Sequence, residues 1–367
     1  MSHWLHSIRV LRMQVPLVKP YRLSFGPVIA FDTLIVELVD ADGRCAWGEA
    51  TLLTGYTDET IDDAWQLATQ LAEELVRCTP AAFAARCVAA GPAAPFTATA
   101  FMSASEMLAG SALLRPAGKT RVPILGLLHA TERSAVRDEF AALLAGGYHT
   151  IKVKVGFDVE DDIRNVATIQ TEVGGRAAIR LDANQGYTAA EACRFLAALD
   201  PADIELFEQP CAAGDWASHA AAVQVARVPM MLDESIYGIA DIERAARERQ
   251  ADVVKVKLMK FVSLEALTQS IARIRDLGMK AVLGNGVAND LGCWMEACVA
   301  AACIDNAGEM NGFLKPVGGL FADPLQFVDG HIVLPTGRQP VLDPAALQRF
   351  SVGRHVATHH QTQGVLA

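Results

Sequence analysis

The sequence has no apolar segment as long as a signal-peptide core or a membrane span, no block of basic residues and no paired cysteine motif. Each absence excludes a class of protein. Its 32 lysines and arginines are scattered among 42 acidic residues, for a net charge of −10, so nucleic acid and anionic membranes are expected to be poor partners. The first residues, MSHWLHSIRVLRMQV, interrupt their apolar positions with His and Arg, unlike a signal peptide. A stretch of low charge near residue 90 contains Gly91, Pro92 and Pro95, which argues against a membrane span. We therefore expect a cytoplasmic protein.

The eight cysteines show neither C-x-x-C pairs nor the spacing of a zinc site. In a cytoplasmic chain such cysteines are expected to be reduced thiols, most of them buried. They are Cys45, Cys78, Cys87, Cys193, Cys211, Cys293, Cys298 and Cys303. The sequence therefore predicts neither a disulfide framework nor a zinc site.

Two patterns divide the 367 residues, of which 51% are hydrophobic. The first hundred residues hold two alternating or apolar runs, the second turning at Asp42 and Gly43, and then DETIDDAWQLATQLAEEL with helical spacing and an acidic start. From Val122 the chain alternates strand-like and helical segments, which is typical of a parallel barrel. The eight strand candidates are VPILGLL, TIKVKV, AAIRLDAN, DIELFEQP, VPMMLDES, ADVVKVKL, MKAVLGNG and AGEMNG.

The predicted fold class is therefore α/β, a modified (β/α)7-8 barrel of the TIM type with an α+β capping domain. We expect the capping domain in residues 1–118, the barrel in residues 119–318, and a tail in residues 319–367 that packs back on the capping domain. In the tail, LQFVDGHIVLP predicts a hairpin around Asp329 and Gly330, and DPAALQRF predicts a short helix. The last barrel unit is the least regular, because its spacing shortens between Ala300 and Asp305.

Three carboxylates follow consecutive barrel strands: Asp182 in RLDAN, Glu208 in LFEQP and Asp233 in MLDES. They are 26 and 25 residues apart, one strand and helix unit each, so all three are expected at the carboxyl-terminal mouth where barrel enzymes have their active sites. Each alone could be a helix cap or a solvated loop residue. Together, three oxygen ligands without Cys or His suit one Mg²⁺ per subunit, for which Mn²⁺ could substitute.

Lysines flank these acids. The alternation in IKVKVG, residues 151–156, puts Lys152 and Lys154 on one strand face, and Lys257 ends the sixth strand in KVKLMK. Lysines on both sides of a metal-bound substrate can act as general base and acid if their pKa is lowered. We expect Lys152 and the metal ion to lower the pKa of Lys154. The simpler alternative is an exposed edge strand whose lysines deter aggregation.

These motifs, with WGEA in the first domain, carry a resemblance to a known family. Over nearly its whole length the sequence resembles the enolase superfamily and, within it, the muconate lactonizing enzyme subgroup. The resemblance implies that Asp182, Glu208 and Asp233 bind Mg²⁺. It also implies that Lys154 and Lys257 form the acid/base pair on opposite faces of the substrate.

The resemblance assigns further roles around this pair. Lys152 would tune Lys154 and touch the substrate carboxylate, Asn184 would hydrogen-bond near the metal, and Glu234 would support Lys257. A site like that of mandelate racemase would need a His-Asp dyad on the seventh strand, but no histidine occurs between His219 and His331. Members of the subgroup suggest a homo-oligomer, from dimer to octamer.

Two departures from the family pattern bear on the substrate. In KLMKFVS, Phe261 and Val262 stand where the family has Gly-Gly after the second lysine of the sixth-strand motif. The eighth strand has Glu309 and Asn311 where dipeptide epimerases have Asp-x-Asp. Because these positions shape the substrate pocket, the usual named activities do not transfer directly to this chain.

The expected chemistry is Mg²⁺-dependent abstraction of the α-proton of a small carboxylate through an enediolate. The leading hypothesis is an epimerase, racemase or syn-dehydratase of an amino-acid-like substrate, with proline-type acids such as cis-3-hydroxy-L-proline as the favoured example. A substrate ammonium would be received by acids and amides of the last strands, namely Glu309, Asp290, Asn285 and Asn289. His129, after the first strand, could also reach the mouth. The alternatives are a muconate-type cycloisomerase and a non-catalytic barrel, which would have no need of both lysines and all three carboxylates.

Overall fold

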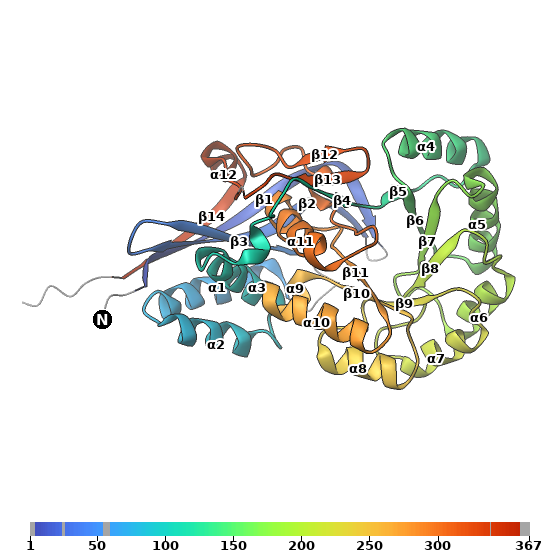
Figure 1. Cartoon of the computed structure of the whole chain (residues 1–367), viewed down its shortest axis with the longest axis horizontal. Helices are drawn as coiled ribbons and strands as arrows, with labels where there is room; N and C mark the ends of the chain where they lie inside the picture. The colour runs from blue at the N-terminus through green and yellow to red at the C-terminus, as the bar shows by residue number, and fades with distance from the viewer. Residues whose placement is uncertain (1–3, 24–25, 54–58, 338, 360–367) are drawn as a thin grey trace, which may run out of the picture.

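The computed structural model describes residues 4–23, 26–53, 59–337 and 339–359. An antiparallel sheet with its helices occupies one end of the molecule and a parallel barrel the other (Figure 1). The first and last described strands pair with each other at the end away from the barrel (Figure 1). No helix in these ranges is long and apolar enough to cross a membrane.

The capping domain contains a four-stranded antiparallel sheet whose order is β14(Ser351–Thr358), β1(Leu5–Leu23), β2(Gly26–Asp40) and β3(Cys45–Leu52). Because β14 comes from the tail, the two ends of the chain build one sheet. Helices α1(Ile61–Leu75) and α3(Pro95–Leu108) cover this sheet, and α2(Pro80–Ala90) packs against these two helices (Figure 1). Helix α1 begins where Thr60 accepts a hydrogen bond from the backbone of Asp63, with two acids in its first turn.

The barrel contains seven parallel strands: β5(Gly126–Leu128), β6(Thr150–Lys154), β7(Ala178–Asp182), β8(Ile204–Glu208), β9(Met230–Leu232), β10(Val253–Val256) and β11(Lys280–Leu283). They are neighbours in sequence order, because each crossover returns beside the strand it left. The crossovers are α4(Arg133–Ala145), α5(Val159–Val173), α6(Ala189–Ala198), α7(Trp216–Val225), α8(Ile239–Arg247), the short α9(Leu258–Phe261) with α10(Leu264–Asp276), and α11(Asp290–Cys303).

The eighth predicted strand, AGEMNG, is not a regular strand in the structure. Its Gly308 makes a single parallel bridge to Ile124, and its backbone bonds to both neighbours: Gly308 N to Pro123 O at 3.0 Å and Glu309 N to Leu283 O at 3.0 Å. The segment therefore closes the barrel between β11 and the start of the first unit. The expectation of a regular strand is wrong, because the chain pairs here for only one or two residues before it turns.

The first predicted strand is also divided. VPILGLL splits into β4(Thr120–Pro123) and β5, and β4 pairs with β13(His331–Leu334) of the tail hairpin. The hairpin partner is β12(Gln326–Val328), and both Asp329 and Gly330 have positive φ at its turn, as a tight two-residue hairpin requires. The tail therefore touches the barrel through this hairpin and continues through α12(Pro344–Phe350) to β14 of the capping sheet.

The register of the parallel sheet places the predicted metal ligands and Lys154 at the same height along the barrel axis. Lys154 lies beside Asp182, Asp182 beside Glu208, and Glu208 beside Met231, two residues before Asp233. In the alternating strand β6 the residues Ile151 and Val153 pack outward against the helices, while Lys152 and Lys154 point into the barrel. β6 is an inner strand, so the exposed-edge alternative for K-x-K is wrong.

Candidate active site

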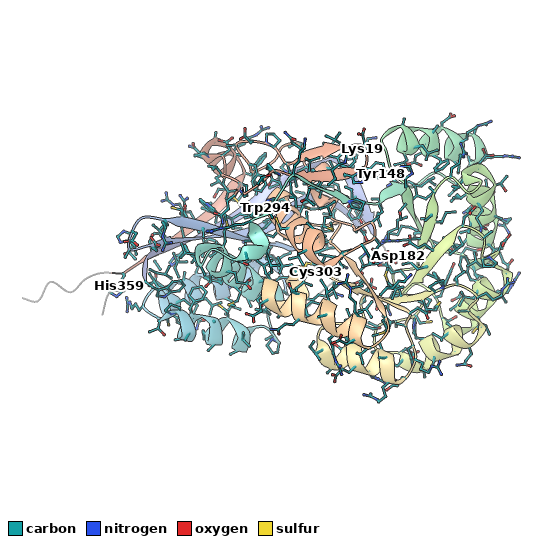
Figure 2. The ribbon with its side chains drawn as sticks, viewed as in Figure 1. Lys19, Tyr148, Asp182, Trp294, Cys303 and His359 are labelled. Atoms are coloured by element: carbon teal, nitrogen blue, oxygen red, sulfur yellow. The ribbon has the colours of Figure 1, made fainter. Side chains whose placement is uncertain are left out.

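A cavity of about 280 Å³ opens at the carboxyl-terminal mouth of the barrel. Asp182 at the end of β7 lies in the barrel half of the molecule in Figure 2. Tyr21 of β1 and Leu53 after β3 bring the capping domain into the wall of the cavity. The barrel residues in the lining are Lys152, Lys154, Asp182, Asn184, Gln185, Asp233, Glu234, Lys255, Lys257, Met259, Asn285, Gly286, Val287 and Glu309.

Lys152 joins the first two predicted metal ligands. Its Nζ lies 2.7 Å from Asp182 Oδ2 and 2.9 Å from Glu208 Oε2, and its side chain is 2% exposed. Lys154 Nζ lies 2.6 Å from the same Asp182 oxygen. The two lysines of IKVKVG therefore share one carboxylate, which offsets the repulsion between them.

The third predicted ligand, Asp233, is held by two lysines of the KVKLMK motif. Lys257 Nζ lies 2.7 Å from Asp233 Oδ2, and Lys260 Nζ lies 2.8 Å from Asp233 Oδ1. Lys260 also donates to the backbone oxygen of Asp233 at 2.6 Å. The pKa of Asp233 is held well below its ordinary value, because attraction to these lysines outweighs its burial.

Lys154 and Lys257 lie on opposite walls of the cavity. Lys154 ends β6 and Lys257 directly follows β10, the second and sixth of eight barrel segments. Strands four places apart in an eight-membered ring face each other. The strands between them, β7 and β8, carry Asp182 and Glu208, and the segment after β9 carries Asp233. A substrate bound in the cavity beside Asp182 and Asp233 would therefore have one of these two lysines on each side.

Lys152 lowers the pKa of Lys154, as the sequence predicts, but the net shift produced by the side chains around Lys154 is upward. Burial is the largest single effect and lowers this pKa further, but the combined interactions with Asp182, Tyr21 and Glu309 outweigh burial and Lys152, so the pKa of Lys154 is raised. The sequence places Lys152 and Lys154 side by side without showing that one carboxylate serves both. The pKa of Lys152 is likewise raised, because attraction to Asp182, Glu208 and Glu309 outweighs its complete burial.

Asn184 and Glu234 form a second layer around the lysines. Asn184 Oδ1 accepts a hydrogen bond from Lys154, and its Nδ2 donates to Glu234 Oε1 at 3.0 Å. The other oxygen of Glu234, Oε2, is buried without a hydrogen-bond partner among the described residues. Burial and the neighbouring acids Asp233 and Asp182 raise the pKa of Glu234 to about 7.

Glu309 points into the barrel, where two lysines hold it. Its Oε2 accepts from Lys152 Nζ at 2.8 Å and from Lys255 Nζ, which also lies 3.2 Å from Glu208 Oε1. Lys255 is the first lysine of VVKVK, two residues before Lys257, and its side chain is 2% exposed. The structure therefore adds to the site a lysine that the sequence reasoning missed, although the same K-x-K spacing as in IKVKVG could have indicated it.

Other predicted pocket residues have structural contacts instead. Asn285 lines the cavity, but both polar atoms of its side-chain amide bond to the backbone of Val287. Its Oδ1 accepts from Val287 N, and its Nδ2 donates to Val287 O. Asp290 Oδ2 accepts from the backbone of Leu320 and Phe321. His129 is not among the described residues that line the cavity.

Asn289 and the WGEA motif join the two domains. Glu49 of WGEA accepts from Asn289 N at 2.6 Å and from Gly292 N at 2.8 Å, both at the start of α11. A carboxylate at a helix amino terminus is favoured by the unpaired N–H groups there. Asn289 Nδ2 donates to Thr33 Oγ1 of the capping sheet at 2.8 Å. Asn289 therefore lies at the domain interface and not in the substrate cavity.

The departure from Gly-Gly leaves a strained residue after α9. Val262 has a φ of 66°, in the left-handed region that a β-branched residue avoids. Such a conformation costs on the order of 1–3 kcal/mol and is found most often near functional sites. Val262 ends the short turn that begins directly after Lys257 and carries Lys260.

All eight cysteines are free, as expected, but only four of them, Cys87, Cys211, Cys293 and Cys298, are buried. Cysteine is not part of the cavity lining. The donor set at the mouth is therefore made of carboxylate and amide oxygens, which Mg²⁺ prefers.

The residues present fit a divalent cation in charge and donor type. In the described part of the chain, no three acidic, His or Cys side chains stand close enough together to hold a metal ion. Lysine ammonium groups lie between the carboxylates instead, Lys152 between Asp182 and Glu208. Asp182 and Glu208 share Lys152, and Asp233 lines the same cavity as Asp182, so a metal ion bound by them would replace ammonium contacts.

Comparisons with known proteins agree with this geometry. Residues 135–338 match the family described as enolase C-terminal domain-like. The chain is 26% identical over 311 residues to the L-Ala-D/L-Glu epimerase of Bacillus subtilis (strain 168), covering 80% of this chain and 84% of that protein. It is 28% identical over 269 residues to muconate cycloisomerase 1-2 of Acinetobacter lwoffii, covering 69% of this chain and 70% of that protein.

Solved structures share the whole fold. The dipeptide epimerase from Cytophaga hutchinsonii, complexed with Mg and the dipeptide D-Ala-L-Val, superposes with a TM-score of 0.86 at 21% identity, covering 97% of this chain and 100% of that one. The family match spans more than half of the present chain. The protein therefore belongs to the enolase C-terminal domain-like family and is an enzyme of the enolase superfamily, related to its muconate lactonizing enzyme subgroup.

Proposed function

We propose that the protein is a Mg²⁺-dependent epimerase or racemase that inverts the α-carbon of a small, amino-acid-derived carboxylate. The observation that carries this proposal is the placement of Lys154 and Lys257 across one cavity, on the second and sixth of eight barrel segments. Inversion needs one group to remove a proton from one face and another to return a proton to the opposite face. The L-Ala-D/L-Glu epimerase among the relatives supports this outcome over others.

Each polar residue has a part in the proposed reaction. Mg²⁺ held by Asp182, Glu208 and Asp233 would supply positive charge beside the substrate carboxylate, which acidifies the α-proton. Lys154 and Lys257 transfer protons at Nζ, each on its own side of the α-carbon. Asn184 positions Lys154 through the hydrogen bond that its Oδ1 accepts.

A second candidate is the dehydration of a proline-type acid such as cis-3-hydroxy-L-proline. In that reaction one lysine removes the α-proton and then protonates the departing hydroxyl on the same face. The observation that favours it is the unequal access of the two lysines, because the side chain of Lys154 is 21% exposed and that of Lys257 is 8% exposed. A muconate-type cycloisomerase is the remaining alternative, supported by the cycloisomerase among the relatives.

Hydrogen exchange in D₂O tests the proposal. The protein is incubated with Mg²⁺ or Mn²⁺ and a panel of amino, N-acylamino and hydroxy acids, and each acid is analysed for deuterium gain, inversion and loss of water. Epimerisation predicts deuterium at the α-carbon together with inversion. Dehydration predicts loss of 18 Da, as one water, and cycloisomerisation predicts neither loss of water nor inversion.

Single lysine variants assign the two faces. Lys154→Ala and Lys257→Ala should each abolish inversion, lowering the rate by about 10²- to 10⁴-fold. Each variant should still exchange the α-proton of the one enantiomer that faces its remaining lysine. Lys280→Ala, an exposed lysine at the opposite end of β11, is the control and should leave the rates unchanged. Near wild-type inversion in both active-site variants would refute the proposal.

We also propose that the enzyme is a cytoplasmic homo-oligomer, from dimer to octamer, acting on a small molecule without nucleic acid or membrane partners. An apolar patch at the rim of the mouth supports self-association. Val18 and Ile29 of the β1–β2 hairpin are 65% and 69% exposed, and Leu314 and Val317 are 43% and 46% exposed. The β1 segment of the hairpin and the segment after residue 314 are neighbours, because Val18 N donates to Lys315 O and Leu17 bridges Pro316.

A further inference from the structure

A buried acid of helix α11, Glu296, has no part in the proposed reaction and is not among the described residues that line the cavity. The residue is 2% exposed. Its Oε1 accepts a hydrogen bond from Leu258 N at 2.9 Å, and its Oε2 is buried without a hydrogen-bond partner among the described residues. A buried carboxyl costs free energy unless its oxygens are satisfied, so packing alone would favour an apolar residue at this position.

The hydrogen bond to Glu296 acts on the peptide group that directly follows Lys257. The backbone of Lys257 is extended, with φ of −138° and ψ of 136°, and helix α9 begins at the next residue, Leu258. The chain therefore turns a corner between these two residues. The first N–H groups of a helix have no partner within the helix, and Glu296 supplies one for Leu258. The acid thereby fixes the peptide plane at the corner and, with it, the direction of the Lys257 side chain.

The two lysines of the proposed reaction differ in what holds their backbone. Lys154 lies within the ladder between β6 and β7. The pairing of β10 with β11 ends at Val256, and the pairing of β10 with β9 ends two residues earlier. Lys257 therefore lies beyond both ladders. The hydrogen bond that Glu296 accepts holds the backbone beside Lys257, as strand pairing holds Lys154.

The role of Glu296 as an acceptor does not require its charge. Burial raises the pKa of Glu296 to about 7, although the hydrogen bond from Leu258 and the charges of Lys257 and Lys255 act in the opposite direction. A carboxyl group has an acceptor oxygen for a backbone N–H in both of its protonation states, and so does the amide of glutamine. Glutamine at this position would therefore keep the hydrogen bond, whereas leucine would remove it.

We propose that Glu296 is a positioning residue for Lys257, holding the corner after β10 so that the lysine faces the α-carbon from its own side of the cavity. The inference rests on the proposed function in one respect, since it takes Lys257 as the acid or base of one face. It goes beyond that function by assigning a role to a residue outside the cavity. It also predicts that one face of the reaction can be slowed without the other.

Exchange of the α-proton in D₂O tests the proposal, measured with Mg²⁺ for each enantiomer of the acids that wild type accepts. Glu296→Leu should slow exchange on the Lys257 face by about 10- to 100-fold, as expected for a small misplacement of a reacting group, and should change exchange on the Lys154 face by less than about threefold. Glu296→Gln keeps an acceptor oxygen and should retain both rates. Lys154→Ala, which exchanges through Lys257 alone, assigns the enantiomers to the faces.

The matched control is Glu106→Leu. Glu106 of α3 accepts hydrogen bonds from Leu264 N and Glu265 N at the start of α10, so this variant loses backbone contacts of the same kind without altering the corner. It should leave the ratio of the two exchange rates unchanged. Three results would overturn the inference: equal slowing of both faces by Glu296→Leu, wild-type rates in that variant, or a Glu296→Gln variant that is equally slow.

Chemical labelling tests the position of Lys257 without catalysis. Competitive acetylation with EDTA present, followed by peptide mass mapping, gives the reactivity of Lys257 relative to Lys154. The side chain of Lys257 is 8% exposed and lies 2.7 Å from Asp233 Oδ2. Glu296→Leu should raise the ratio at least about threefold, because a side chain released from its contacts is more accessible, whereas Glu296→Gln and Glu106→Leu should not raise it. An unchanged ratio in Glu296→Leu would overturn the inference. If wild type exchanged the α-proton of no acid, the proposed function would fail, while the labelling ratio would still decide the position of Lys257.

Discussion

Replacement of Lys255 by Met should destabilise the protein while leaving its packing largely unchanged. Lys255 is buried between Glu208 and Glu309, with its side chain 2% exposed. Methionine has a similar length and no charge, so the change removes a cation from between two buried acids. Breaking a buried ion pair by removing one partner costs about 3–5 kcal/mol. Because Lys152 still contacts both acids, we expect the lower end of that range, roughly 3 kcal/mol.

A double-mutant cycle identifies the cause. Glu309→Gln alone leaves Lys152 and Lys255 with one acid fewer and should also be destabilising. Combined with Lys255→Met, it removes a cation and an anion together, so the double variant should be more stable than the sum of the single effects by about 1–3 kcal/mol. The matched control is Lys280→Met, which removes an exposed lysine and should change stability by less than about 0.5 kcal/mol.

Urea unfolding followed by circular dichroism measures each corner of the cycle, at pH 7 and with EDTA present. Removing a cation beside Glu208 should also strengthen Mg²⁺ binding, which calorimetry measures on the same variants. Lower stability with higher metal affinity is a combination that general damage to the fold would not produce. Additive energies in the cycle, or a Lys255→Met variant as stable as wild type, would refute the assignment of this buried ion cluster.

Two other predictions concern the metal ligands and the domain interface. Glu208→Gln should weaken Mg²⁺ or Mn²⁺ binding at least about tenfold, because the number of charged ligands sets much of the affinity of an oxygen site. Calorimetry measures the metal affinity, with the exposed Glu265→Gln as control. An unchanged affinity would contradict the ligand assignment. Burial raises the pKa of Glu49 from 4.5 to about 7, so its contribution to stability is fully present below about pH 4.5 and is lost as pH rises through 7. Glu49→Gln should therefore flatten the fall of the urea midpoint between pH 5 and pH 8; an unaltered slope would show that Glu49 does not titrate in this range.

Much of the barrel could be predicted from the sequence because its signals are local and periodic. Strands buried on both faces appear as short apolar runs, and helices recur between them at a constant spacing. Parallel strands all end at one mouth, so acids at the ends of three successive runs had to converge there. The eighth segment is predicted as a strand because it follows the regular alternation of strands and helices. In the structure it makes only one bridge, which is too short to produce an alternating pattern in the sequence.

The partners of the lysines could not be predicted in the same way. Alternation shows that Lys152 and Lys154 share a face, but not that both contact Asp182 or that the pKa of Lys154 consequently rises. The sequence does not show that Lys260 is buried against Asp233. These contacts depend on distances between strands, which the order of residues does not specify.

The sequence by itself determined the fold class, the family, and the positions of Asp182, Glu208, Asp233, Lys154 and Lys257 at or just after strand ends, because each follows from motifs within a few residues of one strand end. The tertiary structure alone decided how the charges are balanced and which parts of the capping domain reach the cavity. Tyr21, Gly286 and Lys315 are separated by 265 and 29 residues, and no local pattern links them. They meet because the β1–β2 hairpin of the capping sheet reaches the barrel mouth, where burial, hydrogen bonding and charge act between residues that are distant along the chain.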